Sequence, residues 1–358
     1  MTSILSAVIV LGVLVFVHEL GHFIFAKKLG IGVITFSLGF GPKLIGRRYG
    51  ETQYQVAAVP LGGYVKLIGE NPDEEVKEED RARSFSAAPI WKRAMIISAG
   101  PFFNFFLAVV LFSTINFFGI PHLPAKIGEL SPGLPAEAAG LKKGDLILSI
   151  DGQKVTRWDD LSRIIRASHG KKLTLQVRRN GESLEIGVTP QSSKTKNLFG
   201  EEVQIYMIGI QPSDDVILEK VNPVVAVGMG FAQTWGGIKL TVGIIGKLIQ
   251  RVIPAKTIGG PIMIVQLAGE QAKRGILSLV VFMAILSVNL GVINLFPIPI
   301  LDGGHFIFLI LEAILRKPIS IKKMEVAQQI GLILIVLLMV FAFYNDILRL
   351  VSPEGFKF

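Results

Sequence analysis

The sequence contains no cysteine among its 358 residues, and only 18% of its residues are charged. Without cysteine no part of the chain can rely on disulfides, so any domain outside a membrane must fold through its own hydrophobic core. Charged residues make up about a quarter of an average soluble protein, so their shortage argues against a soluble enzyme. Half of the residues are hydrophobic, and the mean hydropathy is +0.53. The composition therefore predicts a membrane protein.

Four segments contain the roughly 20 apolar residues that a helix needs to cross a hydrocarbon core about 30 Å thick. They lie at about 3–25, 94–118, 277–300 and 328–350. The first ten residues carry no Lys or Arg, and the first basic pair, Lys27 and Lys28, follows the apolar run. A cleaved signal peptide has its basic residues first, so we expect this segment to be retained as a helix. The predicted fold class is a multi-pass α-helical membrane protein with about four transmembrane helices.

The net charge of +9 could indicate nucleic-acid binding, but the distribution of the basic residues indicates a membrane topology instead. Basic residues gather in two connections between apolar segments, 26–93 and 301–327. By the positive-inside rule these connections are cytoplasmic. Both termini and the long segment 119–276 are then extracytoplasmic, and no nucleic-acid partner is expected.

Residues 31–69 are rich in glycine and β-branched residues, which predicts short strands and turns. They form either a re-entrant β-hairpin or an ordinary cytoplasmic β-loop, since re-entrance requires backbone that is buried in protein or faces a water-filled cavity. Residues 71–93 mix acidic and basic side chains, and we interpret them as a charged linker without a site. The N-terminal membrane part, 1–118, thus consists of two helices separated by this β region and linker.

Charged residues return over 124–190, together with the short alternating stretches of a soluble domain. The run from Pro135 to Gly152, P-A-x-x-A-G-L-x-x-G-D-x-I-x-x-I-x-G, resembles a PDZ domain of the bacterial, circularly permuted kind. We assign 119–215 to one such domain. PDZ domains bind an extended peptide or a chain terminus at a sheet edge, and a domain that merely fills space is the alternative.

The segment 216–276 is predicted to be extracytoplasmic and amphipathic. Its stretch 221–253 is apolar but carries Trp235 and three basic residues, which favours a helix lying along the membrane interface. A helix that crossed there would place the basic connection 301–327 outside, against the charge rule. The remainder, 277–358, forms the C-terminal membrane part with two transmembrane helices.

The sequence H-E-L-G-H lies inside the first apolar segment. His18 and His22 are four residues apart, so they share one helix face at the spacing that lets two imidazoles bind one Zn²⁺. Glu19 is then the candidate general base for a metal-activated water. A carboxylate within a bilayer costs about 2.5–3.5 kcal/mol on insertion scales, so a functional site is expected. Histidines satisfied by helix neighbours, with Glu19 reaching toward the cytoplasm, are the alternative.

A catalytic zinc needs a third protein ligand, and the soluble H-E-x-x-H enzymes do not supply the pattern. The metzincin continuation requires Gly at 25 and His at 28, but these positions are Phe25 and Lys28. No Asp or Glu occurs over 23–50, which removes a nearby downstream glutamate. The third ligand must come from a distant part of the chain.

The best candidate for this ligand is Asp302. Pro297 and Pro299 break the third apolar helix just before it, and unwound backbone lets a short carboxylate turn toward a neighbouring helix. Asp302 could also act only as a helix cap before its Gly-Gly pair. Glu312 and His305 are weaker candidates, with His305 near enough to support the ligands.

The sequence resembles the site-two protease family of intramembrane zinc metalloproteases, and specifically its bacterial RseP-type members. The resemblance covers almost the whole chain and rests on H-E-L-G-H, F-x-x-G-F-G-P from Phe36, P-L-G-G-Y-V-K from Pro60, A-G-P-F-F-N-F from Ala99 and N-x-F-P-I-P-x-L-D-G-G from Asn294. It implies that His18, His22 and Asp302 bind zinc, that Glu19 is the base, and that 31–69 is a membrane-associated β-hairpin. It also implies a substrate-binding role for Asn289, Asn294, Gly62, Gly63, Pro297 and Pro299.

The function expected from this resemblance is cleavage of transmembrane segments of single-span membrane proteins, such as anti-sigma factors or remnant signal peptides. The expected location is the bacterial cytoplasmic (inner) membrane, with the active site toward the cytoplasm. Many RseP-type proteins carry two PDZ domains, whereas this chain has room for one. A non-catalytic PDZ adaptor and a metal transporter are the alternatives, although no internal repeat of the transporter kind is evident.

Overall fold

The computed structural model describes residues 2–70, 76–196, 202–219, 221–317 and 319–351. It divides into two compact units, which are described separately. Unit 1 comprises Met1–Ile115, Pro223–Leu248 and Pro254–Phe358, and unit 2 comprises Asn116–Asn222 and Ile249–Ile253. Residues 71–75 of the expected charged linker, 197–201 of the expected PDZ domain and the C-terminal residues 352–358 lie outside the described residues.

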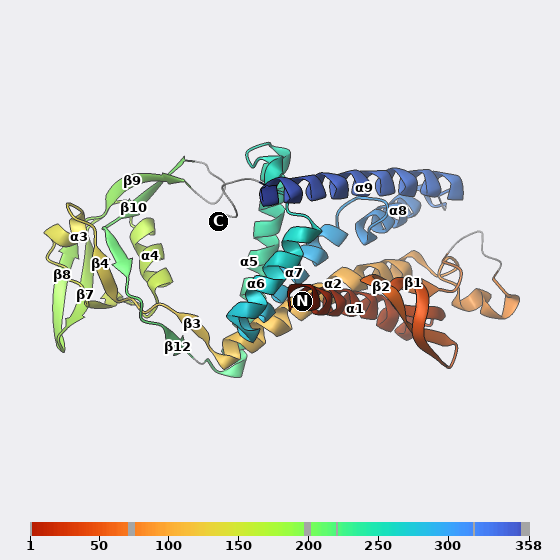
Figure 1. Ribbon diagram of the computed structural model, residues 1–358, viewed down its shortest axis with the longest axis horizontal. Helices are drawn as coiled ribbons and strands as arrows, with labels where there is room; N and C mark the ends of the chain where they lie inside the picture. Colours follow the sequence, from red (N-terminus) through yellow and green to blue (C-terminus); the bar gives the residue numbers. More distant parts are fainter. Residues whose placement is uncertain (1, 71–75, 197–201, 220, 318, 352–358) are drawn as a thin grey trace. The chain divides into compact units, whose positions relative to one another are not determined.

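Among the described residues, four helices of unit 1 are long and apolar enough to cross a membrane, which confirms the prediction of four such helices. They are α1 (Thr2–Lys28), α2 (Ile90–Phe118), α7 (Ile276–Asn294) and α9 (Ile321–Val351), labelled in Figure 1. Val10 and Leu14 of α1 form a buried cluster with Met283 of α7. In contrast, α9 exposes apolar side chains along its length, such as Ile333 and Leu337, as expected for a surface covered by lipid.

The third apolar segment differs from its prediction. It was expected to run over 277–300, but α7 ends at Asn294, because Pro297 and Pro299 lack the N–H that a helix needs. A helix that the sequence did not predict, α8 (Asp302–Leu315), then occupies part of the expected connection 301–327. The last helix begins at Ile321 and not at 328, so the connection before it is short.

The first turn of α8 packs against the unwound segment before it. A Cβ added to Gly303 would lie 2.3 Å from the backbone oxygens of Leu295 and Phe296, and one added to Gly304 would lie 2.2 Å from that of Ile298. Only glycine permits this close approach of two backbones. The Gly-Gly pair therefore fixes the place where α8 begins, one residue after Leu301.

The β region consists of β1 (Val33–Tyr49) and β2 (Thr52–Leu67), which are both bent and pair with each other twice. Residues 35–38 pair with 53–56 on one side and with 63–66 on the other, while 43–49 pairs with 52–57. The resulting sheet has four adjacent segments in the order 43–49, 52–57, 33–38 and 63–67. The segment 63–67 is an edge among the described strands. A 3₁₀ turn, η1 (Glu78–Arg83), follows before α2.

The segment expected at 216–276 contains two main helices, α5 (Pro223–Ile249) and α6 (Pro261–Arg274), separated by the short η2 (Ala255–Thr257). A Cβ on Gly230 of α5 would lie 2.2 Å from Ser113 of α2, so these two helices touch closely. The buried carboxylate of Asp346 in α9 accepts hydrogen bonds from the backbone N–H groups of Gly260 and Met263, at 2.9 and 3.1 Å. Asp346 therefore caps the start of α6 and joins it to α9.

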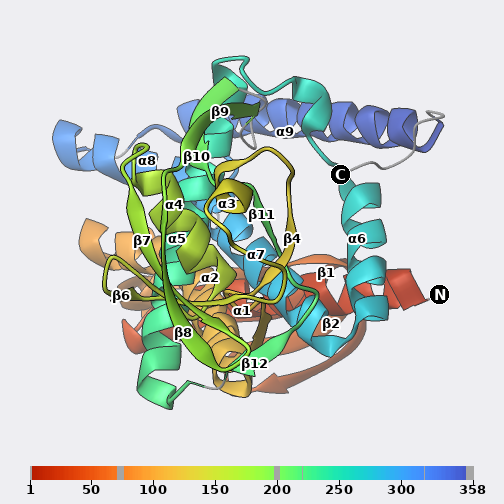
Figure 2. The same cartoon turned by 90° about the vertical axis from the view of Figure 1, so that its left-hand side faces the viewer.

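Unit 2 is a small α/β unit with its own core, as the absence of cysteine requires. Its central sheet has the order β6-β5-β7-β8 and is covered by α4 (Trp158–Ala167), whose Leu161 and Ile165 are buried. The sheet strands are β5 (Leu146–Ile150), β6 (Gln153–Lys154), β7 (Leu173–Arg179) and β8 (Glu182–Val188). The remaining elements are β3 (Ile120–His122), β4 (Ile127–Leu130), α3 (Pro135–Ala138), β9 (Gln191–Lys196), β10 (Glu202–Met207), β11 (Ile210–Pro212) and β12 (Ile217–Glu219), several of which are visible in Figure 2.

Unit 2 contains an ion pair between a buried carboxylate, Asp145, and a partly exposed guanidinium, Arg179. The Asp145 side chain is 1% exposed, and both of its oxygens accept hydrogen bonds from the Arg179 guanidinium at 2.7 Å. Burial by itself would raise the pKa of Asp145, but Arg179 and the backbone N–H of Lys142 outweigh it and lower the pKa. The pair therefore stabilises unit 2 above about pH 4, and this contribution is lost as the pH falls through the lowered pKa.

Replacing Arg179 with Ala should destabilise unit 2, because the buried Asp145 carboxylate loses its partner. Hydrogen exchange of β5 and β7 amides in the full-length protein in detergent would measure this change. The exposed neighbour Arg178→Ala is the control and should change stability by less than about 0.5 kcal/mol. Equal effects of the two substitutions would contradict this account of the ion pair.

Candidate active site

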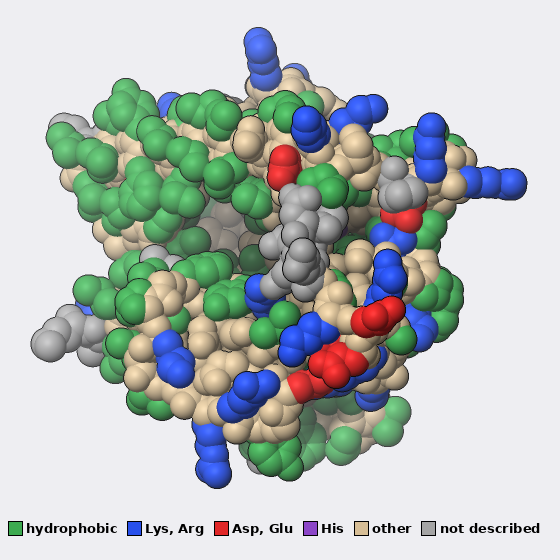
Figure 3. All heavy atoms as spheres, turned by 90° about the vertical axis from the view of Figure 1, so that its right-hand side faces the viewer, with side chains coloured by type: hydrophobic (Ala, Val, Ile, Leu, Met, Phe, Trp, Pro, Cys, Tyr) green, Lys and Arg blue, Asp and Glu red, His purple; other side chains and the backbone are tan. Residues whose placement is uncertain are grey.

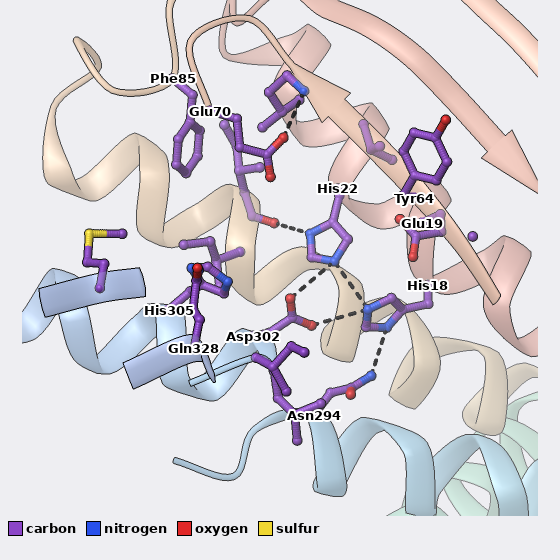
Figure 4. A pocket seen from close by; sticks show the side chains of 18 of the residues that line it. His18, Glu19, His22, Tyr64, Glu70, Phe85, Asn294, Asp302, His305 and Gln328 are labelled. Carbon is purple, nitrogen blue, oxygen red and sulfur yellow. Dashed lines mark hydrogen bonds and ion pairs between the residues drawn. The ribbon is translucent and has the colours of Figure 1, made fainter. Parts of the chain in front are cut away.

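Three side chains from two distant parts of the chain meet in unit 1 (Figure 4). His18 Nε2 lies 3.2 Å from Asp302 Oδ2, and His22 Nε2 lies 3.5 Å from Asp302 Oδ1. The two Nε2 atoms are themselves 3.2 Å apart. All three candidate ligand atoms lie within 4.8 Å of one another. The structure thus brings together the three residues that the sequence proposed as metal ligands.

The local structure explains this convergence. The α-helical repeat places His18 and His22 one turn apart on the same face of α1. Asp302 is the first residue of α8, where the unfilled N–H groups of the helix favour a negative charge. The helix cap residue is Leu301, so the Asp302 side chain is free to turn toward α1.

The chemistry of these groups fits a cation. Asp302 Oδ2 is buried and has no hydrogen-bond partner among the residues that the structure describes, although it faces the nitrogen of His18. If each ring carries its proton on Nδ1, both Nε2 lone pairs and the carboxylate converge on one point, which is unfavourable without a positive charge. Two imidazoles and one carboxylate form a common catalytic zinc site, in which a fourth position is left for water.

Both ring Nδ1 atoms contact α2. His22 Nδ1 lies 2.8 Å from the backbone oxygen of Ile96, which can accept its proton. His18 Nδ1 lies 3.1 Å from the amide nitrogen of Asn104, and the amide nitrogen of Asn294 is farther away at 3.5 Å. A metal-binding histidine is oriented by the partner of its second nitrogen, so α2 supports the site without supplying a ligand.

Gly100 of α2 makes room for the two histidines. A Cβ at this position would lie 2.2 Å from His22 Nε2 and 2.7 Å from His18 Cε1. Neither distance is possible between non-bonded atoms, so any larger residue would displace the imidazoles. Ile96, Gly100 and Asn104 follow one another at intervals of four residues and therefore form one stripe on α2 that faces the site.

A cavity of about 910 Å³ opens next to the three residues. Its walls come from α1, the edge segment 63–67 of the sheet, the start of α2, the segment before α8, and the first turns of α8 and α9. Glu19 lines the cavity, and the backbone N–H of Val65 donates a hydrogen bond to its carboxylate. A Cβ on Gly63 would lie 3.0 Å from Glu19 Cγ, so this glycine keeps space for the carboxylate.

The residues that the sequence proposed for substrate binding lie in different places. Asn294 and Gly63 line the cavity. Asn289 accepts a hydrogen bond from Thr241 of α5 at 2.7 Å and is not among the described lining residues. Gly62, Pro297 and Pro299 are likewise outside the described lining. Gly62 packs on the Phe40 ring, and Pro299 contacts Gly304 and Gly331.

The two weaker candidates for the third ligand also have defined positions. Both Glu312 oxygens accept hydrogen bonds from Arg93 of α2, at 2.6 and 3.0 Å, away from the histidines. His305 lines the cavity one turn after Asp302. Sequence reasoning assigned no role to Gly100 or Asn104. The signal for Asn104 was present, since a polar residue inside an apolar segment usually has a structural or functional partner.

The fold and the site define a zinc-dependent membrane hydrolase. The model of peptidase family M50 matches residues 6–338. A protein of Agrobacterium fabrum named "Putative zinc metalloprotease" is 37% identical over 98% of this chain and 96% of its own length. A Campylobacter jejuni protein with the same description is 35% identical over 97% of this chain and 94% of its own length. The "Regulator of sigma-E protease RseP" of Salmonella typhimurium is 31% identical over 97% of this chain and 99% of its own length.

The chain therefore belongs to peptidase family M50, the site-2 protease family. It is a zinc metalloendopeptidase and a membrane protein, as the sequence predicted. Proteins of this family act on membrane-protein substrates in the bilayer. Membership of a peptidase family favours the enzyme over the adaptor and the transporter that the sequence left open.

Replacing Asp302 with Asn should lower zinc affinity by more than about 100-fold, because the neutral amide is a poor ligand beside two histidines. Zinc in the purified full-length protein would be measured by metal analysis and by titration against a chelator. Glu312→Gln is the matched control, and it should retain zinc because Glu312 pairs with Arg93. Loss of zinc from the Glu312 variant, with retention in the Asp302 variant, would refute the assignment.

Replacing Gly100 with Ala should displace His22 and lower the zinc content well below that of the parent protein. The substitution should not destabilise the helix α2 itself, since alanine is favoured over glycine in a helix interior by about 0.5–1 kcal/mol. Gly12→Ala in α1 is the control, because a Cβ there meets no atom within 4 Å. Zinc analysis together with circular dichroism would separate displacement of a ligand from unfolding. The same zinc content in both variants would show that Gly100 makes no room for the site.

Proposed function

We propose that this protein is an intramembrane endopeptidase that cleaves transmembrane segments of single-span membrane proteins. The observation that carries this proposal is that His18, Glu19 and His22 belong to α1, a helix long and apolar enough to cross a membrane. Anti-sigma factors and remnant signal peptides are suitable substrates. The name of the Salmonella relative, a regulator of sigma-E protease, supports a role in regulated intramembrane proteolysis.

Hydrolysis requires water, and the cavity beside α1 offers a path for it. Polar side chains line this cavity, including Glu70 after the sheet, His305 of α8, and Glu325 and Gln328 of α9. Such residues can hold water where a purely apolar wall would exclude it. We assign the cavity to the cytoplasmic half of the membrane, because its lining includes residues of both basic connections, such as Glu70 and Glu325.

Glu19 is proposed as the general base. His18, His22 and Asp302 would hold zinc, which when bound activates water and polarises the scissile carbonyl. The carboxylate oxygens of Glu19 would accept the proton of the attacking water and return it to the leaving amine nitrogen. Val65 N–H and the space at Gly63 keep this carboxylate in the cavity next to the zinc ligands.

The edge segment 63–67 is proposed to bind the unwound substrate. A transmembrane helix hides its amide groups in internal hydrogen bonds, so it must unwind before a carbonyl can be attacked. Gly63, Tyr64, Val65 and Leu67 line the cavity from the sheet edge, where an extended chain can add as a further strand. Pairing with this edge would compensate for the hydrogen bonds that the substrate helix loses.

Asn294 is the better candidate of the two asparagines for contact with the substrate. It lies in the cavity at the end of α7, whereas Asn289 is bonded to Thr241 of α5. Its amide could donate to a substrate carbonyl or to the developing oxyanion. Asn289 is proposed to act at a distance, by holding α5 against α7.

A topology with the active site toward the cytoplasm of a bacterial inner membrane has support from unit 1. The β region and the start of α9, which belong to the two basic connections, lie at the same end of unit 1 in Figure 1. Lys and Arg side chains are spread over this end in Figure 3. By the positive-inside rule this end faces the cytoplasm. Both termini, and the segment 119–276, would then be extracytoplasmic.

Two further proposals concern the extracytoplasmic part. Unit 2 is proposed as a PDZ domain that binds a peptide or chain terminus, based on the pattern that includes Gly144 and the buried Asp145. The alignment with the Salmonella relative spans 449 positions, more than this chain contains, which fits a relative with an additional inserted domain. The helix α5 is proposed to lie along the membrane surface, and in both ribbon views it runs across the direction of α1 and α9 (Figures 1 and 2).

Replacing Glu19 with Gln should reduce cleavage by about 10²–10⁴-fold while zinc binding is retained, since the amide cannot accept the proton. Purified protein in detergent would be incubated with a single-span test substrate, with and without a zinc chelator, and cleavage followed by mass spectrometry. Glu325→Gln is the matched control, since this carboxylate lines the same cavity from α9 but is not one of the proposed zinc ligands.

Cleavage by the Glu325 variant should stay within a few-fold of the parent rate, and the cut should fall inside the apolar segment of the substrate. The proposal fails if the Glu19 variant cleaves as fast as the parent, or if chelation has no effect. Cuts confined to the extramembrane part of the substrate would leave a zinc protease but exclude an intramembrane one.

A further inference from the structure

Asn104 is a fully buried polar residue in the middle of the apolar helix α2, and the proposed reaction does not use it. Its side chain is 0% exposed, and its amide nitrogen lies 3.1 Å from His18 Nδ1. Its amide oxygen has no hydrogen-bond partner among the described residues. A buried acceptor without a partner is costly, so this amide calls for an explanation.

The protonation of the His18 ring explains why a buried amide lies at this position. His18 Nε2 faces both Asp302 and His22, so zinc would bind at this nitrogen. A neutral imidazole that binds a metal through Nε2 carries its proton on Nδ1. That buried N–H needs an acceptor, and two side-chain amides lie within reach of it, those of Asn104 and Asn294.

Of these two amides, Asn104 is the better acceptor. Turning its amide by 180° exchanges oxygen and nitrogen without changing the shape of the side chain, so Oδ1 comes to Nδ1–H. Ser287 of α7 donates a hydrogen bond to the Asn104 backbone oxygen at 2.7 Å and thus fixes this part of α2. Asn294 is farther from the ring and faces the cavity.

The second histidine has a corresponding arrangement. His22 Nδ1 lies 2.8 Å from the Ile96 backbone oxygen, two helical turns before Asn104 on the same face of α2. The Nδ1–H of His22 would thus donate to a backbone carbonyl, and the Nδ1–H of His18 would donate to a side-chain carbonyl. Gly100, between them, lets both rings approach the helix.

We propose that Asn104 is a positioning residue of the zinc site, whose Oδ1 accepts the Nδ1–H of His18 and so directs the Nε2 lone pair at the metal. Asn294 is then left free for the substrate. The role of Asn104 concerns zinc binding alone, so it does not depend on which substrate the enzyme cleaves.

Two substitutions of Asn104 distinguish this role from simple packing. In Asn104→Asp the carboxylate can still accept from Nδ1–H, so zinc affinity should stay within about threefold of the parent or rise. In Asn104→Leu the shape is nearly kept but the acceptor is lost, so affinity should fall by about 10–100-fold. A packing role predicts the reverse order, since Leu suits an apolar interior and a buried charge does not.

The zinc affinity of the purified full-length proteins would be measured by competition with a chelator, and the visible spectrum of the Co²⁺-loaded forms would report the geometry of the site. Asn294→Leu is the matched control and should bind zinc like the parent. Parent-like affinity of the Asn104→Leu protein, or equal losses in both Asn104 variants, would overturn the proposal. So would a loss of affinity on Asn294→Leu alone. If the Asn104→Leu substitution prevents folding, weak zinc binding by Asn104→Asp would still overturn it.

Discussion

Every polar atom in an apolar helix at membrane depth needs a polar partner. This constraint explains how the elements of unit 1 are arranged around the polar residues of α1. The helix α1 carries two imidazoles and a carboxylate within five residues, where lipid can satisfy none of them. Asp302, the Ile96 carbonyl, Asn104 and the Val65 N–H lie next to these groups and come from α8, α2 and the sheet. The site is therefore a meeting point of four elements, and α1 could not hold it alone.

Close packing makes this arrangement possible, and glycine residues lie at several places where two elements approach closely. Gly100 gives the histidines access to α2, and Gly303 and Gly304 let the start of α8 rest on the unwound chain after α7. The unwinding at Pro297 and Pro299 costs helical hydrogen bonds, but it allows the chain to turn and start a new helix with Asp302 in its first turn. The proline and glycine residues of this motif thus shape the backbone, while Asp302 and Asn294 supply the polar groups for which a chemical role is proposed.

The sheet and the cavity show how the same residues could serve catalysis and binding together. The edge segment 63–67 places Val65 N–H on Glu19 and also forms a wall of the cavity. The Glu19 carboxylate, the three proposed zinc ligands and this strand edge thus line one cavity. Such an arrangement suits an extended peptide that must be held straight beside the reacting groups. The apolar side chains that α9 exposes are suited to contact with lipid and are not part of this site.

The sequence by itself determined the features that depend on local geometry. Four apolar runs of sufficient length predicted the four helices, and the spacing of His18 and His22 predicted a shared ligand face, because the helical repeat is fixed. A broken helix before a lone carboxylate pointed to Asp302. Only the tertiary structure decided which distant groups meet: that β1 and β2 pair twice, that α8 forms, that Glu312 pairs with Arg93, and that Asn289 faces α5 while Asn104 faces His18. These outcomes depend on how segments far apart in the chain pack against each other. The spacing of residues along the chain does not determine those contacts.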